Sequence, residues 1–118
     1  MVTNISLGSS EFRNVVFDKI TFFDEGIVAE ALVSSKGIHY CFSVSAEFYD
    51  TDLESLVTFH SVRRTEPMEV TSICEHVWIR LSYQESSDIL LEYKFTGDKE
   101  DITLSGTFVY WDHEFSSY

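Results

Sequence analysis

The chain has 118 residues, of which 44% are hydrophobic, and it contains 10 Phe, 6 Tyr and 2 Trp. A chain of this length and composition is expected to fold as a single domain over residues 1–118, large enough to bury a core without disulfide bonds. Its 8 basic and 20 acidic side chains give a net charge of −12. This charge disfavours contact with phosphate backbones and anionic lipid, so we expect no nucleic-acid binding.

The sequence contains no membrane segment or targeting signal. No stretch approaches the roughly 20 apolar residues that span a bilayer. The start "MVTNISLGSSEF" has neither a basic region nor an apolar run typical of a signal peptide. We therefore expect no membrane association and a cytoplasmic location. Two cysteines, Cys41 and Cys74, are too few for a disulfide framework and are interpreted as small hydrophobic residues on strands.

Period-two alternation in the first half of the chain predicts antiparallel strands. Asp24-Glu25-Gly26 separates "VVFDKITFF" from "IVAEALVS", and Ser35-Lys36-Gly37 leads into "IHYCFSVSAEFY". In that last run one face is expected to carry the apolar side chains Ile38, Tyr40, Phe42, Val44, Ala46 and Phe48.

One segment, "DTDLESLVTFHSVRR", has helical rather than strand spacing. Leu53, Leu56, Val57 and His60 recur at intervals of three and four residues. We expect a helix near residues 51–63, started by a capping box of Thr51 and Glu54. Acidic residues in its first turn, together with Arg63 and Arg64 in its last, would complement the helix dipole, and Pro67 would prevent its continuation.

The second half returns to strands. "MEVTSI", "HVWIRLSY", "ILLEYKF" and "ITLSGTFVYW" alternate, and the short polar links "QESSD" and "GDKED" predict hairpins. Gly106 indicates a bulge or a close backbone approach. The expected fold is mainly β in the α+β class: a twisted antiparallel sheet or a two-layer β-sandwich, with the single helix packed at an edge or over one opening.

A metal site is one interpretation of the pairs His39-x-Cys41 and Cys74-x-His76. Residues two apart on a strand point the same way, so two such pairs on neighbouring strands could converge on a tetrahedral ion. No catalytic signature accompanies them, since the chain has no G-x-S-x-G elbow, phosphate loop, HExxH helix or calcium loop. The leading expectation is therefore a chain that is not an enzyme and holds no cofactor.

Acidic residues concentrate where strands end, and aromatic side chains interleave with two of these clusters. Carboxylates steer a cationic partner, and aromatic residues dominate interface hot spots. The expected partner-binding residues are Glu47, Tyr49, Asp50, Asp52 and Glu54 around the helix start, and Trp111, Asp112, Glu114 and Phe115 in the C-terminal segment. A third acidic cluster lies at Asp98 to Asp101. The alternative for the rings is that they belong to the core.

The central piece "FSVSAEFYDTDLESLVTFHSV", followed by "VWIRLSYQESSDILLEYKF", resembles small acidic immunity proteins of the WapI type, which belong to bacterial polymorphic and contact-dependent toxin systems. The resemblance covers about Phe12 to Phe108 in pattern more than in identity. It implies a cytoplasmic, non-catalytic protein that binds a cognate toxin, often a basic nuclease, and occludes its active site. No binding residue carries over, because the toxin-facing surface differs between members.

These observations together predict an acidic protein-binding module that inhibits a basic toxin or nuclease domain and is a monomer or weak dimer. One alternative is a small metal-dependent enzyme or zinc protein that uses His39, Cys41, Cys74 and His76. A further alternative is a phage-type inhibitor or a mimic of DNA charge.

Overall fold

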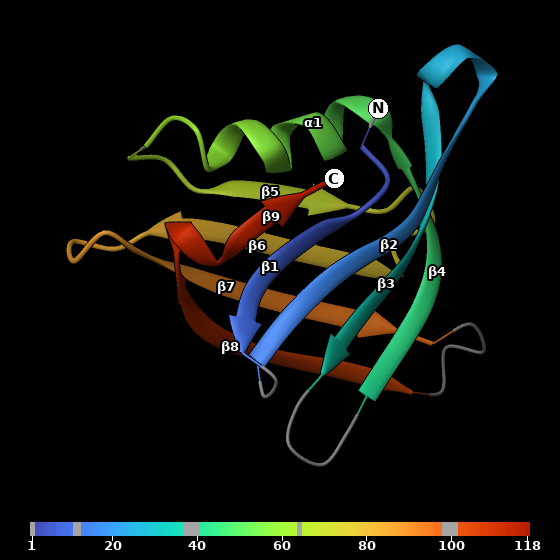
Figure 1. Cartoon of the computed structure of the whole chain (residues 1–118). Helices are drawn as coiled ribbons and strands as arrows, with labels where there is room; N and C mark the ends of the chain where they lie inside the picture. The colour runs from blue at the N-terminus through green and yellow to red at the C-terminus, as the bar shows by residue number, and fades with distance from the viewer. Residues whose placement is uncertain (1, 11–12, 37–40, 64, 98–101) are drawn as a thin grey trace.

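Two antiparallel sheets make up most of the computed structural model, which describes residues 2–10, 13–36, 41–63, 65–97 and 102–118. The first sheet has the strand order β4-β3-β2-β1-β9, with bounds Ile5–Ser10 (β1), Arg13–Phe23 (β2), Val28–Lys36 (β3), Cys41–Tyr49 (β4) and Phe115–Ser117 (β9). The second has the order β5-β6-β7-β8, with bounds Met68–Thr71, Val77–Tyr83, Asp88–Thr96 and Thr103–Trp111. Figure 1 shows the two sheets facing each other. The expected mainly β sandwich with antiparallel pairing is confirmed.

The core lies between the sheets, because alternate residues of each strand point inward. Its largest fully buried side chains come from both sheets and from the helix: Phe17, Phe48, Phe59, Phe95, Tyr110, Leu56, Ile79 and Leu91. The face expected for β4 is confirmed at Val44, Ala46 and Phe48. The alternation expected in the later runs is confirmed by the buried residues of β6 and β7: Val77, Ile79 and Leu81, and Ile89, Leu91, Tyr93 and Phe95. Ile38 and Tyr40 lie outside the described residues.

Each expected hairpin is present. β2 and β3 are joined by the 3₁₀ turn η1 (Asp24–Gly26), and β6–β7 and β7–β8 pair antiparallel in continuous register. Gly106 is confirmed as a point of close approach, because it lies directly opposite Tyr93 and a Cβ there would be only 2.7 Å from the Tyr93 hydroxyl. The tyrosine ring lies over the backbone that a side chain would otherwise cover.

The helix α1 (Asp50–Phe59) lies over the side of the sandwich where β4 and β5 meet, and packs on both strands (Figure 1). Its apolar face carries Leu53, Leu56 and Phe59. Its extent corrects the prediction of residues 51–63: the helix starts one residue earlier and ends four earlier.

The expected capping box is wrong. The N-cap is Tyr49, with no side-chain cap, and the first amide is bound instead by another element, since the N–H of Asp50 donates to the carbonyl of Ile27 at 3.0 Å. Arg63 lies beyond the last turn and does not complement the dipole. Its guanidinium donates to the Ser87 hydroxyl at 2.9 Å and lies 5.8 Å from the Tyr83 ring centroid. Arg64 is outside the described residues.

The C-terminal segment leaves the second sheet and joins the first. After β8, the 3₁₀ turn η2 (Asp112–Glu114) redirects the chain, and β9 pairs antiparallel with β1, with Leu7 opposite Phe115. The amide of Tyr118 donates to the Asn4 carbonyl at 2.9 Å. The two ends of the described chain therefore lie side by side.

Over the described residues, no helix combines the length and the apolar character needed to cross a membrane.

Candidate functional site

A groove of about 430 Å³ runs between the start of α1 and the β2–β3 hairpin. Most of its walls are apolar, and two carboxylates border it. We call it the α1 groove; it is lined by Val2, Phe22, Gly26, Asp50, Leu53, Glu54, Val57 and Thr58. Asp50, Leu53, Glu54 and Val57 share one side of the helix because they are spaced by three and four residues. The groove therefore offers an apolar floor with negative charge beside it.

The geometry of the groove depends on the turn of the β2–β3 hairpin. Glu25 and Gly26 both have positive φ, 61° and 90°, which tightens the turn. Asp50 then donates its N–H to the Ile27 carbonyl, so the hairpin and the first turn of α1 are joined by a backbone hydrogen bond. The hairpin projects past the start of the helix in Figure 1. A Cβ on Gly26 would lie 3.9 Å from a carboxylate oxygen of Asp50.

Large apolar side chains near the hairpin turn are exposed to solvent. Phe23 is 43% exposed, Ile27 60% and Tyr49 52%. Phe23 pairs with Val28, and Val28 pairs with Tyr49, so these side chains occur at one end of the first sheet, next to the helix start. Aromatic side chains beside unneutralised carboxylates are the composition expected of a protein interface.

The residues predicted around the helix start do not form one cluster. Asp50 and Glu54 line the groove, and Tyr49 lies next to it in sequence with an exposed ring. Asp52 is two residues from Asp50, on the side of the helix that carries Leu56 and Phe59, and burial there raises its pKa. Glu47 lies elsewhere, in a second pocket.

The second pocket, of about 330 Å³, lies on the outer face of the first sheet and is lined by Glu30, Ser45, Ala46, Glu47, Ile73, Cys74 and His76. Glu30 and Glu47 are directly opposite on β3 and β4, and the Ser45 hydroxyl donates to Glu30 at 3.0 Å. The Ile73 N–H donates to the Glu47 carbonyl at 2.8 Å, which holds the β5–β6 turn against β4.

The structure does not support the four-ligand metal interpretation. Cys74 and His76 line one pocket beside Glu47. Cys41 is on the same strand as Glu47 but six residues before it, a separation of roughly 20 Å at the rise of a strand. His39 lies outside the described residues. Across the part of the chain that the structure describes, no three His, Cys, Asp or Glu side chains come together as metal ligands.

The C-terminal segment has the predicted rings and acids, but most of them have partners within the chain. Asp112 accepts a hydrogen bond from the Tyr83 hydroxyl at 2.9 Å, and Glu114 accepts one from the backbone N–H of Trp111 at 2.9 Å. The Phe115 ring stacks on the His60 imidazole, with centroids 3.9 Å apart. Of the four predicted residues, Trp111 is the one with a largely exposed ring, at 49%.

His60 is the centre of this C-terminal contact region. Its Nδ1 lies 2.8 Å from the Leu56 carbonyl and its Nε2 lies 2.6 Å from the Tyr110 hydroxyl. The carbonyl can only accept, so Nδ1 carries the proton and the Tyr110 hydroxyl donates to Nε2 of the neutral ring. Burial lowers the pKa of His60, opposed by its bond to Leu56 and by the Asp112 charge. Burial also raises the pKa of Tyr83 to about 12.

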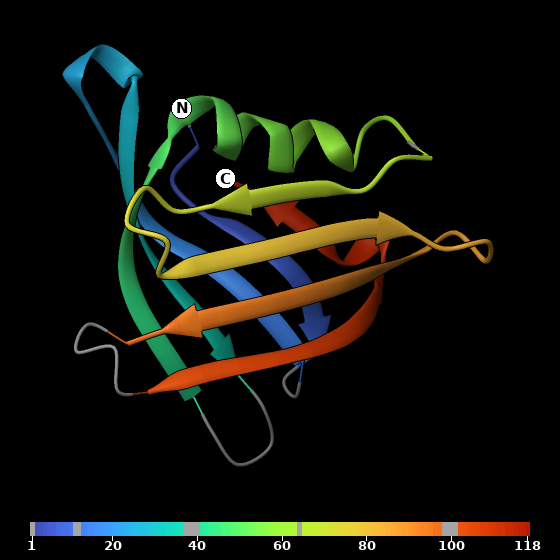
Figure 2. The same cartoon turned by 180° about the vertical axis from the view of Figure 1, so that it is seen from behind.

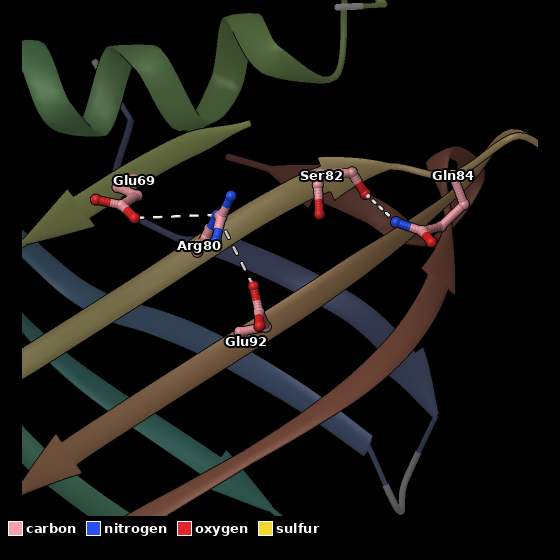
Figure 3. Close-up of polar contacts among 5 residues, drawn as sticks. All are labelled: Glu69, Arg80, Ser82, Gln84 and Glu92. Carbon is pink, nitrogen blue, oxygen red and sulfur yellow. Dashed lines mark hydrogen bonds and ion pairs between the residues drawn. The ribbon is translucent and has the colours of Figure 1, made fainter. Parts of the chain in front are cut away.

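The outer face of the second sheet carries a line of charges in which one arginine lies between two glutamates. Arg80 on β6 lies between Glu69 on β5 and Glu92 on β7, with its Nε 3.9 Å from a carboxylate oxygen of each (Figure 3). These residues are directly opposite in register. Such solvent-exposed pairs contribute about 0–1 kcal/mol to stability, and the single arginine offsets the charge of one of the two carboxylates.

Sequence reasoning missed the half of the α1 groove that comes from the hairpin. The signal was present: Phe22 and Phe23 stand next to Asp24-Glu25-Gly26, so rings beside acids occur there as they do at Tyr49. What the sequence could not show was that this turn is placed against α1. Comparison with protein-family models, with curated proteins and with solved structures found no match to this chain.

Proposed function

We propose that this chain is a non-catalytic protein-binding module that inhibits a basic partner, such as a toxin or nuclease domain, by docking it at the α1 groove. The observation that carries the proposal is the combination of the groove's apolar walls with Asp50 and Glu54, inside a chain of net charge −12. Neither carboxylate has a basic partner in the described part of the chain. A lysine or arginine next to an apolar side chain would complement both features.

The distribution of charge supports this surface over the others. On the second sheet Arg80 offsets part of the charge of its two acidic neighbours. At the C-terminal segment Asp112 and Glu114 each accept an intramolecular hydrogen bond, which makes them weaker attractors of a cation than the groove carboxylates. At the α1 groove Glu54 is exposed and Asp50 is half-buried, and exposed rings lie nearby. Unpaired carboxylates raise the rate of encounter with a cation, and desolvated rings supply most of the affinity.

The resemblance to WapI-type immunity proteins supports the class of partner. In that class the bound protein would cover the active site of its toxin and need no chemistry of its own. An acidic inhibitor suits a basic nuclease because the toxin's own substrate is anionic, so both ligands would be drawn to the same surface.

The test compares two charge-matched double variants as baits for basic proteins from the source cells. Asp50→Asn with Glu54→Gln removes both carboxylates of the groove. Glu66→Gln with Glu85→Gln removes two exposed carboxylates elsewhere and is the control. The protein captured by the parent chain is then measured against all three at low and high salt.

We expect the captured protein to be basic, to lose activity when bound, and to bind the groove variant at least tenfold more weakly while the control changes less than threefold. Its association rate should fall steeply as salt rises. The proposal is wrong if parent and groove variant bind equally, if the control falls as much as the groove variant, or if no basic protein is retained.

A further inference from the structure

Strand β8 forms an open edge of the second sheet. Among the described residues its only strand neighbour is β7, and in Figure 2 it runs along the lower margin of the sheet, in orange-red. Its nine residues, "TLSGTFVYW", contain neither a charged side chain nor a proline. Charges, prolines and short length are the usual devices that prevent an edge strand from pairing with another chain. β8 has none of them.

The other three sheet edges carry such protection. β4 has Glu47, whose carbonyl is bound by the N–H of Ile73, and α1 packs against the strand. β5 has four residues, follows Pro67 directly and also contacts α1. β9 has three residues. Within the part of the chain that the structure describes, β8 is therefore the edge that lacks such protection.

The register shows which backbone groups of β8 point outward. The Gly97 N–H donates to the Ile102 carbonyl at 2.8 Å, so this pair is a hydrogen-bonded one. Hydrogen-bonded and non-hydrogen-bonded pairs alternate along an antiparallel ladder. The next pair, Thr96 with Thr103, is therefore non-hydrogen-bonded, and the Thr96 N–H indeed donates to His76 on the opposite side.

Extending the alternation leaves every second residue of β8 with its N–H and C=O directed away from β7: Thr103, Ser105, Thr107, Val109 and Trp111. Trp111 agrees with this assignment, because its N–H is bound from outside the sheet by the Glu114 carboxylate. For the four residues before it, no backbone hydrogen bond from another described segment reaches these groups. These four residues therefore offer backbone groups for hydrogen bonds to an added strand, and the site ends where the Glu114 carboxylate binds the Trp111 N–H.

We propose that β8 binds an extended segment of the basic partner as an added strand, with that segment's uncharged centre along Thr103 to Val109 and a lysine or arginine near Asp112. This rests on the proposed function, because the negative charge selects the occupant. A second copy of the chain, also at −12, would be repelled, whereas a cationic strand is attracted. Backbone bonds would give affinity, and alternate side chains would contact Val109 and Trp111, which are 46% and 49% exposed.

The probe is a synthetic peptide, acetyl-Lys-Lys-Thr-Val-Thr-Val-Thr-Val-Thr-amide, whose lysines lie at the Asp112 end of β8 when it pairs antiparallel. Alternate residues are N-methylated so that one edge alone can pair and the peptide cannot self-associate. A matched peptide carries Glu in place of Lys. Binding to the full chain is followed by NMR through amide hydrogen exchange and chemical shifts.

We expect the Lys peptide to slow exchange at Thr103, Ser105, Thr107 and Val109, with little effect on the amides already bonded to β7, and the Glu peptide to bind at least fivefold more weakly. Thr107→Pro removes an outward N–H without breaking a bond to β7 and should weaken binding at least fivefold. Thr107→Ala keeps the N–H and should bind like the parent.

Three outcomes overturn the proposal: no protection of those four amides, equal binding by parent and Thr107→Pro, or a dimer of the parent chain in sedimentation that Thr107→Pro dissolves. If Thr107→Pro fails to fold, the exchange pattern of the parent decides alone. If the peptide instead loses affinity only in Asp50→Asn with Glu54→Gln, the added strand is wrong and the α1 groove still stands. Equal binding of the Lys and Glu peptides at β8 would contradict the proposal that the added strand is cationic.

Discussion

The two ends of α1 have the same kinds of residue and opposite exposures. At the start, Asp50, Glu54 and Tyr49 lie beside an open groove; Glu54 and Tyr49 are exposed and Asp50 is half-buried. At the end, His60 lies among Tyr110, Phe115 and the hydroxyl network of Tyr83 and Asp112. Rings beside acids therefore mark both a candidate interface and a closed internal contact. The closed contact differs from the candidate interface in that its rings and acids have partners within the chain.

The largest expected effect is at the closed end. Phe59→Ala removes a fully buried ring that stacks on Tyr83 at 4.9 Å, and should lower the free energy of unfolding by about 3–5 kcal/mol, measured by urea denaturation. The matched change at the open end, Phe22→Ala, should cost clearly less, because that ring is only half-buried. Equal losses would contradict the contrast between the two ends.

Tyr110→Phe should have the next largest effect. It leaves Nε2 of His60 without its donor in a buried setting, which costs about 1–3 kcal/mol of unfolding free energy. Tyr49→Phe is the control at the open end, where the ring is exposed and the change should stay within about 0.5 kcal/mol. The same denaturation measurement serves both variants. A larger loss of stability from Tyr49→Phe than from Tyr110→Phe would contradict the description of the Tyr49 end as open and the His60 end as closed.

The pH dependence of stability should also come from the closed end. Burial lowers the folded pKa of His60 below its ordinary value of 6.5, so the unfolded chain binds a proton more readily than the folded one. The stabilisation is fully present above pH 6.5 and is lost as pH falls through that value towards the lower folded pKa. Groups facing the ring are Tyr110, Asp112 and, through the hydroxyl network, Tyr83.

Urea denaturation at pH 7.5 and 5.5 measures this dependence. His60→Gln should be less stable than the parent at pH 7.5 and should show a smaller loss between the two pH values, since the remaining slope comes from carboxylates. A variant with the same pH slope as the parent would exclude His60 as its source.

The smallest effect on stability is expected at the groove. Asp50→Asn with Glu54→Gln removes a favourable helix-dipole interaction worth about 0.3–1 kcal/mol and relieves some repulsion in an acidic chain, so the two contributions oppose each other. Unfolding free energy should change by less than about 1 kcal/mol while partner affinity falls. A large loss of stability here would mean that these carboxylates hold the fold together.

The elements that depend on interactions between residues close in sequence were predicted from the sequence pattern. Alternation gave the buried faces of β4, β6 and β7, short polar links gave the hairpins, and three-and-four spacing gave α1. The helix start was misplaced because its first amide is bound by Ile27, a residue on another strand, and no side-chain cap marks it. The helix end was misplaced because Arg63 pairs with the β6–β7 turn.

The candidate site was predicted only in part, because its two halves are far apart in sequence. Asp50 and Glu54 were identified from charge, but Phe22 and Gly26 reach them only through the packing of the hairpin. For the same reason "EFSSY" gave no sign that it pairs with β1, since the partner strand lies more than 100 residues away. Pairing over such separations follows from the assembled core and not from any short segment.

Because β9 completes the sheet that begins with β1, the order of synthesis matters for this fold. A ribosome delivers four strands of the first sheet early, but their last neighbour emerges only after the whole second sheet has been made. Until then β1, with its apolar Ile5 and Leu7, has β2 on one side only, so a nascent chain displays the other edge of β1 without a partner. Chaperone contact with this segment during translation, and a maturation step that waits for Phe115, would follow from that arrangement.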